Sequence, residues 1–168
     1  MKTMPTNVIT NVQLKSLQWK VQLVDAESLC QAAASAVWQE AFKSDKMFEA
    51  TVALADDAMV QKLNLKYRNQ NKATNVLSFP SNTDEQTVSG DIPTLGDVVV
   101  AFETTKAEAP EHVSDHLSHL VVHGCLHLLG YNHEDDEGAH VMEALEIKIL
   151  AGLGIKNPYD SNYAFIMN

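Results

Sequence analysis

The most informative stretch of this chain is His123-Gly-Cys-Leu-His127-Leu-Leu-Gly130-Tyr-Asn-His133. Histidines four residues apart share one face of a helix, with Cβ atoms about 5–6 Å apart, so His123 and His127 can reach one metal ion. Gly130 suits a left-handed turn that ends the helix, after which the chain can bring His133 back to the same ion. Three protein ligands leave a fourth position open, which is typical of a catalytic zinc site. The sequence therefore predicts Zn²⁺ held by these three histidines.

The residue beside the first histidine restricts the chemistry. The offsets match the zinc-protease pattern His-Glu-x-x-His-x-x-Gly-x-x-His except at one position, where Gly124 replaces the glutamate that serves as general base. Glycine cannot accept a proton. Phosphodiester cleavage fits better, because its transition state mainly requires charge stabilisation and positioning. A metallopeptidase remains an alternative if a remote carboxylate, such as that of Glu134 or Asp135, reaches the site.

The seven histidines of the chain all fall between His112 and His140. From Leu117 to Leu129 there is no Asp, Glu, Lys or Arg, so the helix expected at residues 113–129 should be buried. His116 and His119 lie on roughly the same helix face as the proposed ligands, one and two turns earlier. We expect them to pack within the helix bundle or to support the ligands, and we expect His112 and His140 at the surface.

Length and composition favour one globular α/β domain. The 168 residues are 45% hydrophobic and 20% charged, which suits a single hydrolase domain over residues 1–168. No apolar run approaches the roughly 20 residues of a membrane span, so no membrane partner is expected. The N-terminus is too polar for a signal peptide, and Cys30 and Cys125 provide no disulfide framework. Cys125 also lies inside the metal motif, where oxidation would threaten the site, so we expect a cytoplasmic protein.

The charge is unevenly distributed along the chain. The net charge of −10 argues against indiscriminate binding to nucleic acid. Residues 62–72 nevertheless carry three lysines and Arg68, the only arginine, with no acid between them. Taken alone, such a strip is more typical of a solvated helix face. A guanidinium can fork onto two phosphate oxygens, however, and a hydrolase without a carboxylate base needs such a group, so Arg68 is the candidate catalytic residue.

Hydrophobic periodicity predicts a small mixed sheet of about four strands packed with about five helices, with the metal site at the end of a buried central helix. The strands are expected at residues 17–23, 48–54, 76–79 and 97–102. The helices are expected at residues 26–42, from Asp56 or Asp57 through Tyr67, before Pro110, at 113–129, and from Asp135 or Asp136 to Gly152 or Gly154. Residues 81–93 are expected to form a long loop at the rim, and the tail from Tyr159 is expected to be loose.

Three stretches together resemble the YbeY family of bacterial endoribonucleases. They are Leu63-Asn-Leu-Lys-Tyr-Arg68, then Thr74-Asn-Val-Leu-Ser-Phe-Pro80 with Leu95-Gly-Asp-Val98, and the histidine motif. Their order, their spacing and the chain length all fit, so the resemblance covers nearly the whole chain. It implies that His123, His127 and His133 are zinc ligands and that Arg68 is the essential basic residue. Asn132 departs from the family pattern, since an Asp is common before the last histidine.

The resemblance also implies a biological role. A protein of this family would be a zinc-dependent, single-strand-specific endoribonuclease that acts in ribosomal RNA maturation and ribosome quality control. Its partners would be single-stranded RNA, ribosomal RNA, the small ribosomal subunit and assembly factors, and no DNA is expected. A non-catalytic ribosome-assembly factor with structural zinc is the remaining alternative. Asn75, Ser78 and Asp97 lie in the family-like segments, where cleft lining near the metal and ordinary strand-end hydrogen bonding are equally open.

Overall fold

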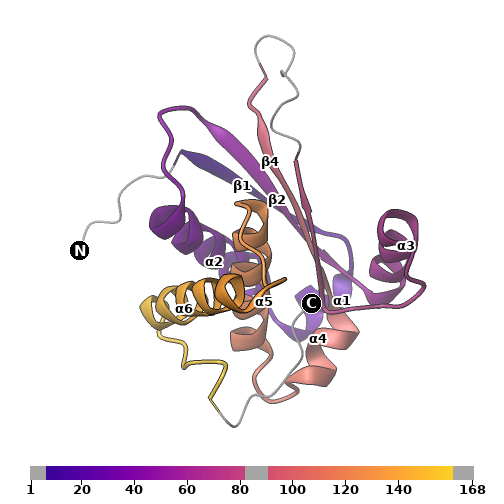
Figure 1. Cartoon of the computed structure of the whole chain (residues 1–168). Helices are drawn as coiled ribbons and strands as arrows, with labels where there is room; N and C mark the ends of the chain where they lie inside the picture. Colours follow the sequence, from indigo (N-terminus) through magenta and orange to yellow (C-terminus); the bar gives the residue numbers. More distant parts are fainter. Residues whose placement is uncertain (1–6, 82–90, 161–168) are drawn as a thin grey trace.

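The computed structural model describes residues 7–81 and 91–160, in which helices cover both faces of one four-stranded sheet (Figure 1). The strands are β1 (Val8–Leu14), β2 (Phe48–Ala55), β3 (Val76–Pro80) and β4 (Thr94–Ala101). The helices are α1 (Leu17–Gln22), α2 (Ala26–Ala41), α3 (Asp57–Arg68), α4 (Phe102–Glu108), α5 (Val113–Leu128) and α6 (Asp136–Gly152). The predicted α/β class is confirmed.

The sheet is mixed, as predicted, with the strand order β1-β2-β4-β3. β1, β2 and β4 run parallel, while β3 runs antiparallel to β4 and forms an edge of the sheet. The central strands read as apolar runs because helices cover them on both faces. Val98, Val100 and Ala101 of β4, for example, are fully buried. The predicted central strand therefore exists, although it begins at Thr94, three residues before the predicted start.

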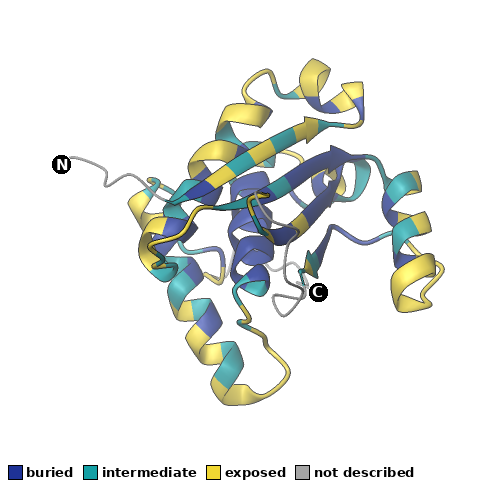
Figure 2. Ribbon diagram, turned by 90° about the horizontal axis from the view of Figure 1, so that it is seen from above, coloured by how far each residue is buried: buried dark blue, intermediate teal, exposed yellow. Residues whose placement is uncertain are grey.

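The two faces of the sheet carry different helices. One face packs on α2 and α5 in the larger hydrophobic core, and the other packs on α3 in a smaller cluster that includes Val60 and Leu77. Figure 2 shows the burial concentrated in the central strands and in α5. Every residue from His116 to Leu126 of α5 is buried, which confirms the predicted buried central helix.

Residues 17–23 were predicted as a strand, and this prediction is wrong. Residues 17–22 form helix α1, and the hydroxyl of its N-cap residue, Ser16, accepts a hydrogen bond from the Gln18 amide. The alternating apolar pattern is misleading because only Trp19 is buried, with its indole donating to Ala55 O, whereas Leu17 and Val21 are 71% and 75% exposed. The first strand is instead β1, and six helices rather than about five occur in the described residues.

The other predicted boundaries agree closely with the structure. The side chain of Asp56 caps α3 by accepting from Met59 N, and that of Asp135 caps α6 by accepting from Gly138 N. α4 ends at Glu108, shortly before Pro110, and α6 ends at Gly152. Most of the predicted loop at 81–93, and the tail beyond residue 160, lie outside the described residues. No helix within the described ranges is long and apolar enough to cross a membrane.

Candidate metal centre and its cleft

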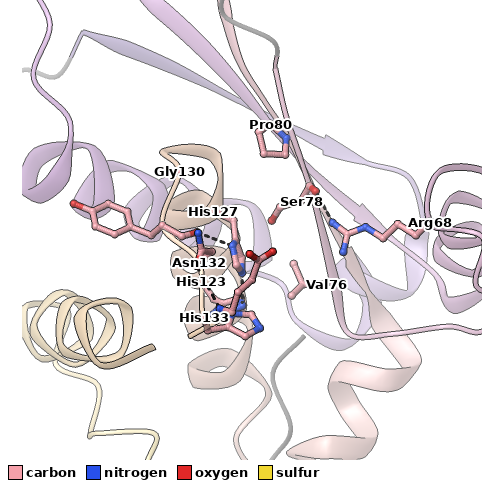
Figure 3. Close-up of a pocket in the computed structure, with 11 residues that line it drawn as sticks. Arg68, Val76, Ser78, Pro80, His123, His127, Gly130, Asn132 and His133 are labelled. Carbon is pink, nitrogen blue, oxygen red and sulfur yellow. Dashed lines mark hydrogen bonds between the residues drawn. The ribbon is translucent and has the colours of Figure 1, made fainter. Parts of the chain in front are cut away.

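The C-terminal end of α5 gathers the three histidines of the motif (Figure 3). His123 and His127 lie one turn apart, and the helix ends just after them, at Leu128. Gly130 has a φ of 98°, a left-handed conformation that reverses the chain and allows the exposed His133 to return. One ring nitrogen from each histidine lies within 4.8 Å of the others. The spatial cluster that the spacing predicted is therefore present.

The hydrogen bonds on the far side of two rings fix their tautomers. His127 Nδ1 faces Tyr131 O at 2.9 Å, and His123 Nδ1 faces Glu146 Oε1 at 2.6 Å. A carbonyl and a carboxylate only accept, so each Nδ1 carries a proton and each Nε2 presents a lone pair. Burial, together with the electrostatic effect of the neighbouring His123, lowers the pKa of His127 to about 4, so this ring is neutral at pH 7.

The spacing of the two Nε2 atoms fits a bound metal ion. They lie 3.0 Å apart, and two lone pairs at that distance repel each other unless a cation lies between them. Two nitrogens bound to zinc at about 2.0–2.1 Å in tetrahedral geometry lie about 3.3 Å apart. With His133 as a third imidazole, the donor set is all nitrogen, which suits zinc, copper, iron or nickel. These residues therefore could hold a metal ion.

Glu146 supports the site from behind and was missed by the sequence analysis. It is fully buried and accepts hydrogen bonds from His119 Nε2 at 2.8 Å, from His123 Nδ1 at 2.6 Å, and from the Tyr159 hydroxyl. Burial by itself would raise the pKa of this carboxyl, but the bonds from the two histidines lower it to about 2. The charged carboxylate therefore orients His123 and fixes its proton.

A sequence signal for Glu146 existed. The buried residues of α6 include Met142, Glu146, Ile149 and Leu150, so the acid interrupts an otherwise apolar helix face. A carboxylate at such a position requires partners, and the histidine-rich helix was the available source. His119 shares the Glu146 carboxylate with His123, whereas His116 bonds to Glu108 at 2.8 Å.

A cleft of about 370 Å³ opens beside the histidines. One wall consists of α3 and β3 residues, and the other consists of the end of α5 and the turn after it. The lining residues are Arg68, Val76, Ser78, Pro80, His123, His127 and residues 130–134. Glu134 is thus in the cleft, while Asp135 is occupied as the cap of α6.

Arg68 lies across this cleft from the histidines, as Figure 3 shows. It is the last residue of α3, and its Nη2 donates to Ser78 O on the edge strand β3 at 2.9 Å. Its guanidinium carbon lies 5.8 Å from the centre of the Phe79 ring. These two contacts hold the guanidinium at the cleft while its other N–H groups can meet a ligand.

Ser78 and Gly124 connect the two walls. Ser78 Oγ donates to Gly124 O at 3.1 Å, so β3 is attached to α5 directly beside His123. A Cβ on Gly124 would lie 2.6 Å from Val98 Cγ1, so a side chain where the proteases have glutamate would have to displace Val98. Of the three family-like polar residues, only Ser78 lines the cleft. Asn75 bonds to Glu108 and to Val76 N at the strand end.

The comparisons with known proteins agree with one another. Residues 11–154 match the protein family described as Endoribonuclease YbeY. A protein of that name from Paramagnetospirillum magneticum is 49% identical over 146 residues, which cover 84% of this chain and 89% of the relative. One from Bradyrhizobium diazoefficiens is 44% identical over 165 residues, 94% of this chain and 90% of the relative.

Solved structures also resemble this chain. A Thermotoga maritima protein determined in solution has a TM-score of 0.50 with this chain at 22% sequence identity, and the match covers 94% of this chain and 100% of that one. At this identity the likeness concerns the arrangement of the chain and not its chemistry.

Proposed function

Because this chain belongs to the YbeY family of endoribonucleases, we propose that it is a zinc-dependent enzyme that cuts single-stranded RNA. The observation that carries the proposal is the cleft whose opposite walls present Arg68 and the three-histidine cluster. Such a cleft can combine a metal with a fixed cation around one phosphodiester. We further propose that its substrate is ribosomal RNA and that it acts in RNA maturation and ribosome quality control in the cytoplasm. Its partners would be the small ribosomal subunit and assembly factors.

His123, His127 and His133 would hold the zinc ion in this proposal. A bound zinc would supply a Lewis acid to the phosphodiester. The protein contributes the orientation of the ligands, because Glu146 and Tyr131 O each accept a ring proton and direct the opposite nitrogen toward the cluster. In the residues the structure describes, no fourth His, Cys, Asp or Glu joins this cluster, which favours a catalytic site over a structural one.

Arg68 would be the catalytic residue that contacts the phosphate. Its anchoring to Ser78 O holds the guanidinium in place before substrate arrives, so little reorganisation is needed as charge develops on the phosphoryl oxygens. Ser78 also binds the backbone of α5 at Gly124. One residue therefore sets the position of Arg68 relative to the histidines.

The peptidase alternative has little support in this geometry. Gly124 carries no side chain that could act as a base, Val98 and Ser78 lie close against it, and the family is one of endoribonucleases. Glu134 is the cleft carboxylate that could serve a peptidase as base. A casein-type substrate in the assays below tests this directly.

The decisive experiment compares Arg68 variants at matched zinc content on a labelled single-stranded RNA. Arg68→Ala should keep the fold and the metal but lose cleavage by about 10²-fold or more, the scale of one lost transition-state donor. Arg68→Lys should restore only part of the rate, because a point charge cannot replace the guanidinium fork. Lys62→Ala is the matched control, since Lys62 is an exposed cation on the same helix that does not line the cleft.

Three results would refute parts of the proposal. Cleavage by Arg68→Ala at the wild-type rate would remove Arg68 from the mechanism. Full activity after exhaustive chelation, or the absence of about one zinc per chain, would remove the metal. Hydrolysis of casein without cleavage of RNA would replace the nuclease with a peptidase.

A further inference from the structure

An exposed aromatic ring lies directly beside the proposed phosphate contact. Tyr67, the neighbour of Arg68 at the end of α3, is 59% exposed. Its ring packs against Phe79 with centroids 5.4 Å apart and an interplanar angle of 61°. An edge-to-face contact of this kind fixes the orientation of the ring while leaving much of it accessible.

The alternation of β3 places this ring pair just across the strand edge from the cleft. Ser78 points toward α5 and bonds to Gly124, whereas Phe79 packs in the cluster on the α3 face. Arg68 contacts both sides, through Ser78 O and through the face of Phe79. Figure 1 shows α3 and α5 on opposite sides of the sheet. A polynucleotide held at Arg68 can therefore have one residue in the cleft and the adjacent one over α3.

The charge around the ring suits a nucleic acid. Lys66 Nζ lies 5.1 Å from the centre of the Tyr67 ring. Arg68 is the next residue along the chain. No acid occurs in residues 62–72, although the whole chain carries a net charge of −10. A ring that lies next to Lys66 and Arg68 in the sequence, in a segment free of acids, offers the two features by which proteins bind single strands, with bases on aromatic faces and phosphates on cations.

We propose that Tyr67, supported by Phe79, is a stacking platform for an unpaired RNA base adjacent to the phosphate at Arg68. This inference rests on the proposed nuclease function and goes beyond it by naming a second contact with the substrate. Bases inside a duplex are already stacked on their neighbours, so only an unpaired base is free to cover the ring. The platform would thus give the enzyme a physical basis for preferring single strands.

Fluorescence provides a direct test. Both tryptophans of the chain, Trp19 and Trp38, are buried, so Tyr67→Trp introduces an exposed indole that a stacked base should quench. Zinc-loaded Tyr67→Trp is mixed with labelled oligoribonucleotides in a stopped-flow instrument, so that binding is recorded before cleavage. Single-stranded RNA should quench the signal, whereas RNA duplex and an oligonucleotide of abasic ribose units should not. Val21→Trp, at an exposed position of α1, is the control and should show no quenching.

Kinetics separate stacking from a structural role. Tyr67→Ala and Tyr67→Leu should raise KM for single-stranded RNA about 5- to 100-fold, the range measured for one base–aromatic stack. Tyr67→Phe should retain the wild-type KM, because a phenyl face stacks equally well. The KM for RNA containing abasic sites should be unchanged in all variants. Zinc content should be the same throughout.

The outcomes distinguish the platform from the nuclease function. If Tyr67→Ala lowers only the urea midpoint and keeps the wild-type KM, Tyr67 is structural and the platform is refuted while RNA cleavage stands. Quenching of Tyr67→Trp by abasic RNA to the same extent as by normal RNA also refutes it. If the wild-type protein neither binds nor cuts RNA, both the proposed function and the platform are wrong.

Discussion

Replacing Glu146 with glutamine should weaken both the fold and the metal site, although this residue touches no substrate. One carboxylate oxygen accepts from His123 Nδ1, and the other accepts from His119 Nε2 and from the Tyr159 hydroxyl. Glutamine has the same size but only one acceptor oxygen, so its NH₂ group must face one of these N–H donors. One of the two buried donors then loses its partner, and where that donor is His123, the ring also loses the contact that fixes its proton.

The size of the effect follows from the pKa of the carboxyl. A shift from 4.5 to about 2 corresponds to about 3 kcal/mol of stabilisation of the charged form in the folded protein, at about 1.4 kcal/mol per pKa unit. Because the folded pKa lies below the unfolded one, this stabilisation is complete above about pH 4.5. It decreases as the pH falls toward 2. For a chain of this length, 3 kcal/mol lowers Tm by about 6–12 °C.

Urea unfolding of the chelator-treated protein tests the stability effect. At pH 7 Glu146→Gln should be about 3 kcal/mol less stable than wild type, and the gap should narrow steadily between pH 4.5 and pH 3. Competition with a chromophoric chelator should show zinc affinity reduced by about 10- to 100-fold, the usual effect of removing a ligand's hydrogen-bond partner. The matched control is Glu40→Gln, which breaks the surface ion pair with Lys148 and should cost no more than about 1 kcal/mol.

Two results would contradict this reasoning. One is a wild-type urea midpoint for Glu146→Gln at pH 7, which would mean that the buried carboxylate is not charged in the folded state. The other is unchanged zinc affinity, which would mean that Glu146 does not orient His123.

Two further substitutions test the metal helix. His127→Ala should lose stoichiometric zinc in elemental analysis, whereas His112→Ala, at an exposed position, should retain the metal. Full zinc content in His127→Ala would remove His127 from the proposed ligand set. Gly124→Ala should destabilise the protein by about 1–2 kcal/mol in urea, because the clash with fully buried Val98 outweighs the gain of up to about 1 kcal/mol in helix propensity. In the control Gly152→Ala, the added Cβ has no neighbour within 4 Å, so this substitution should be neutral or stabilising. If Gly124→Ala is also stabilising, α5 can move away from the sheet and the predicted clash is wrong.

Local patterns predicted much of the architecture because they depend on backbone geometry alone. The helix at 113–129, the strand at 48–54 and the aspartate caps of α3 and α6 were all found close to their predicted positions. The prediction of a strand at 17–23 was wrong for an equally local reason. Six or seven residues with alternating apolar side chains fit a strand or a short helix, and only the burial of Trp19 against Ala55 O distinguishes them.

β1 was not predicted, because its apolar alternation is weak. It lies at the edge of the sheet, and its burial alternates between buried or intermediate and exposed residues. Its polar residues, Thr10, Asn11 and Gln13, weaken the hydrophobic signal. Pairing with β2 along its whole length stabilises it, and such pairing cannot be seen in the segment itself.

Local sequence is enough to set the spacing that puts His123 and His127 on one helix face and to supply the glycine that turns the chain back toward them. These are properties of a few consecutive residues, set by helical periodicity and by φ at Gly130. Only the tertiary structure placed Glu146 behind His123, 23 residues away, and Arg68 across the cleft by way of Ser78 O. Those contacts depend on how α6 packs on α5 and on the position of β3 at the sheet edge. Residues brought together by such long-range packing have no characteristic spacing in the sequence, so local patterns cannot predict them.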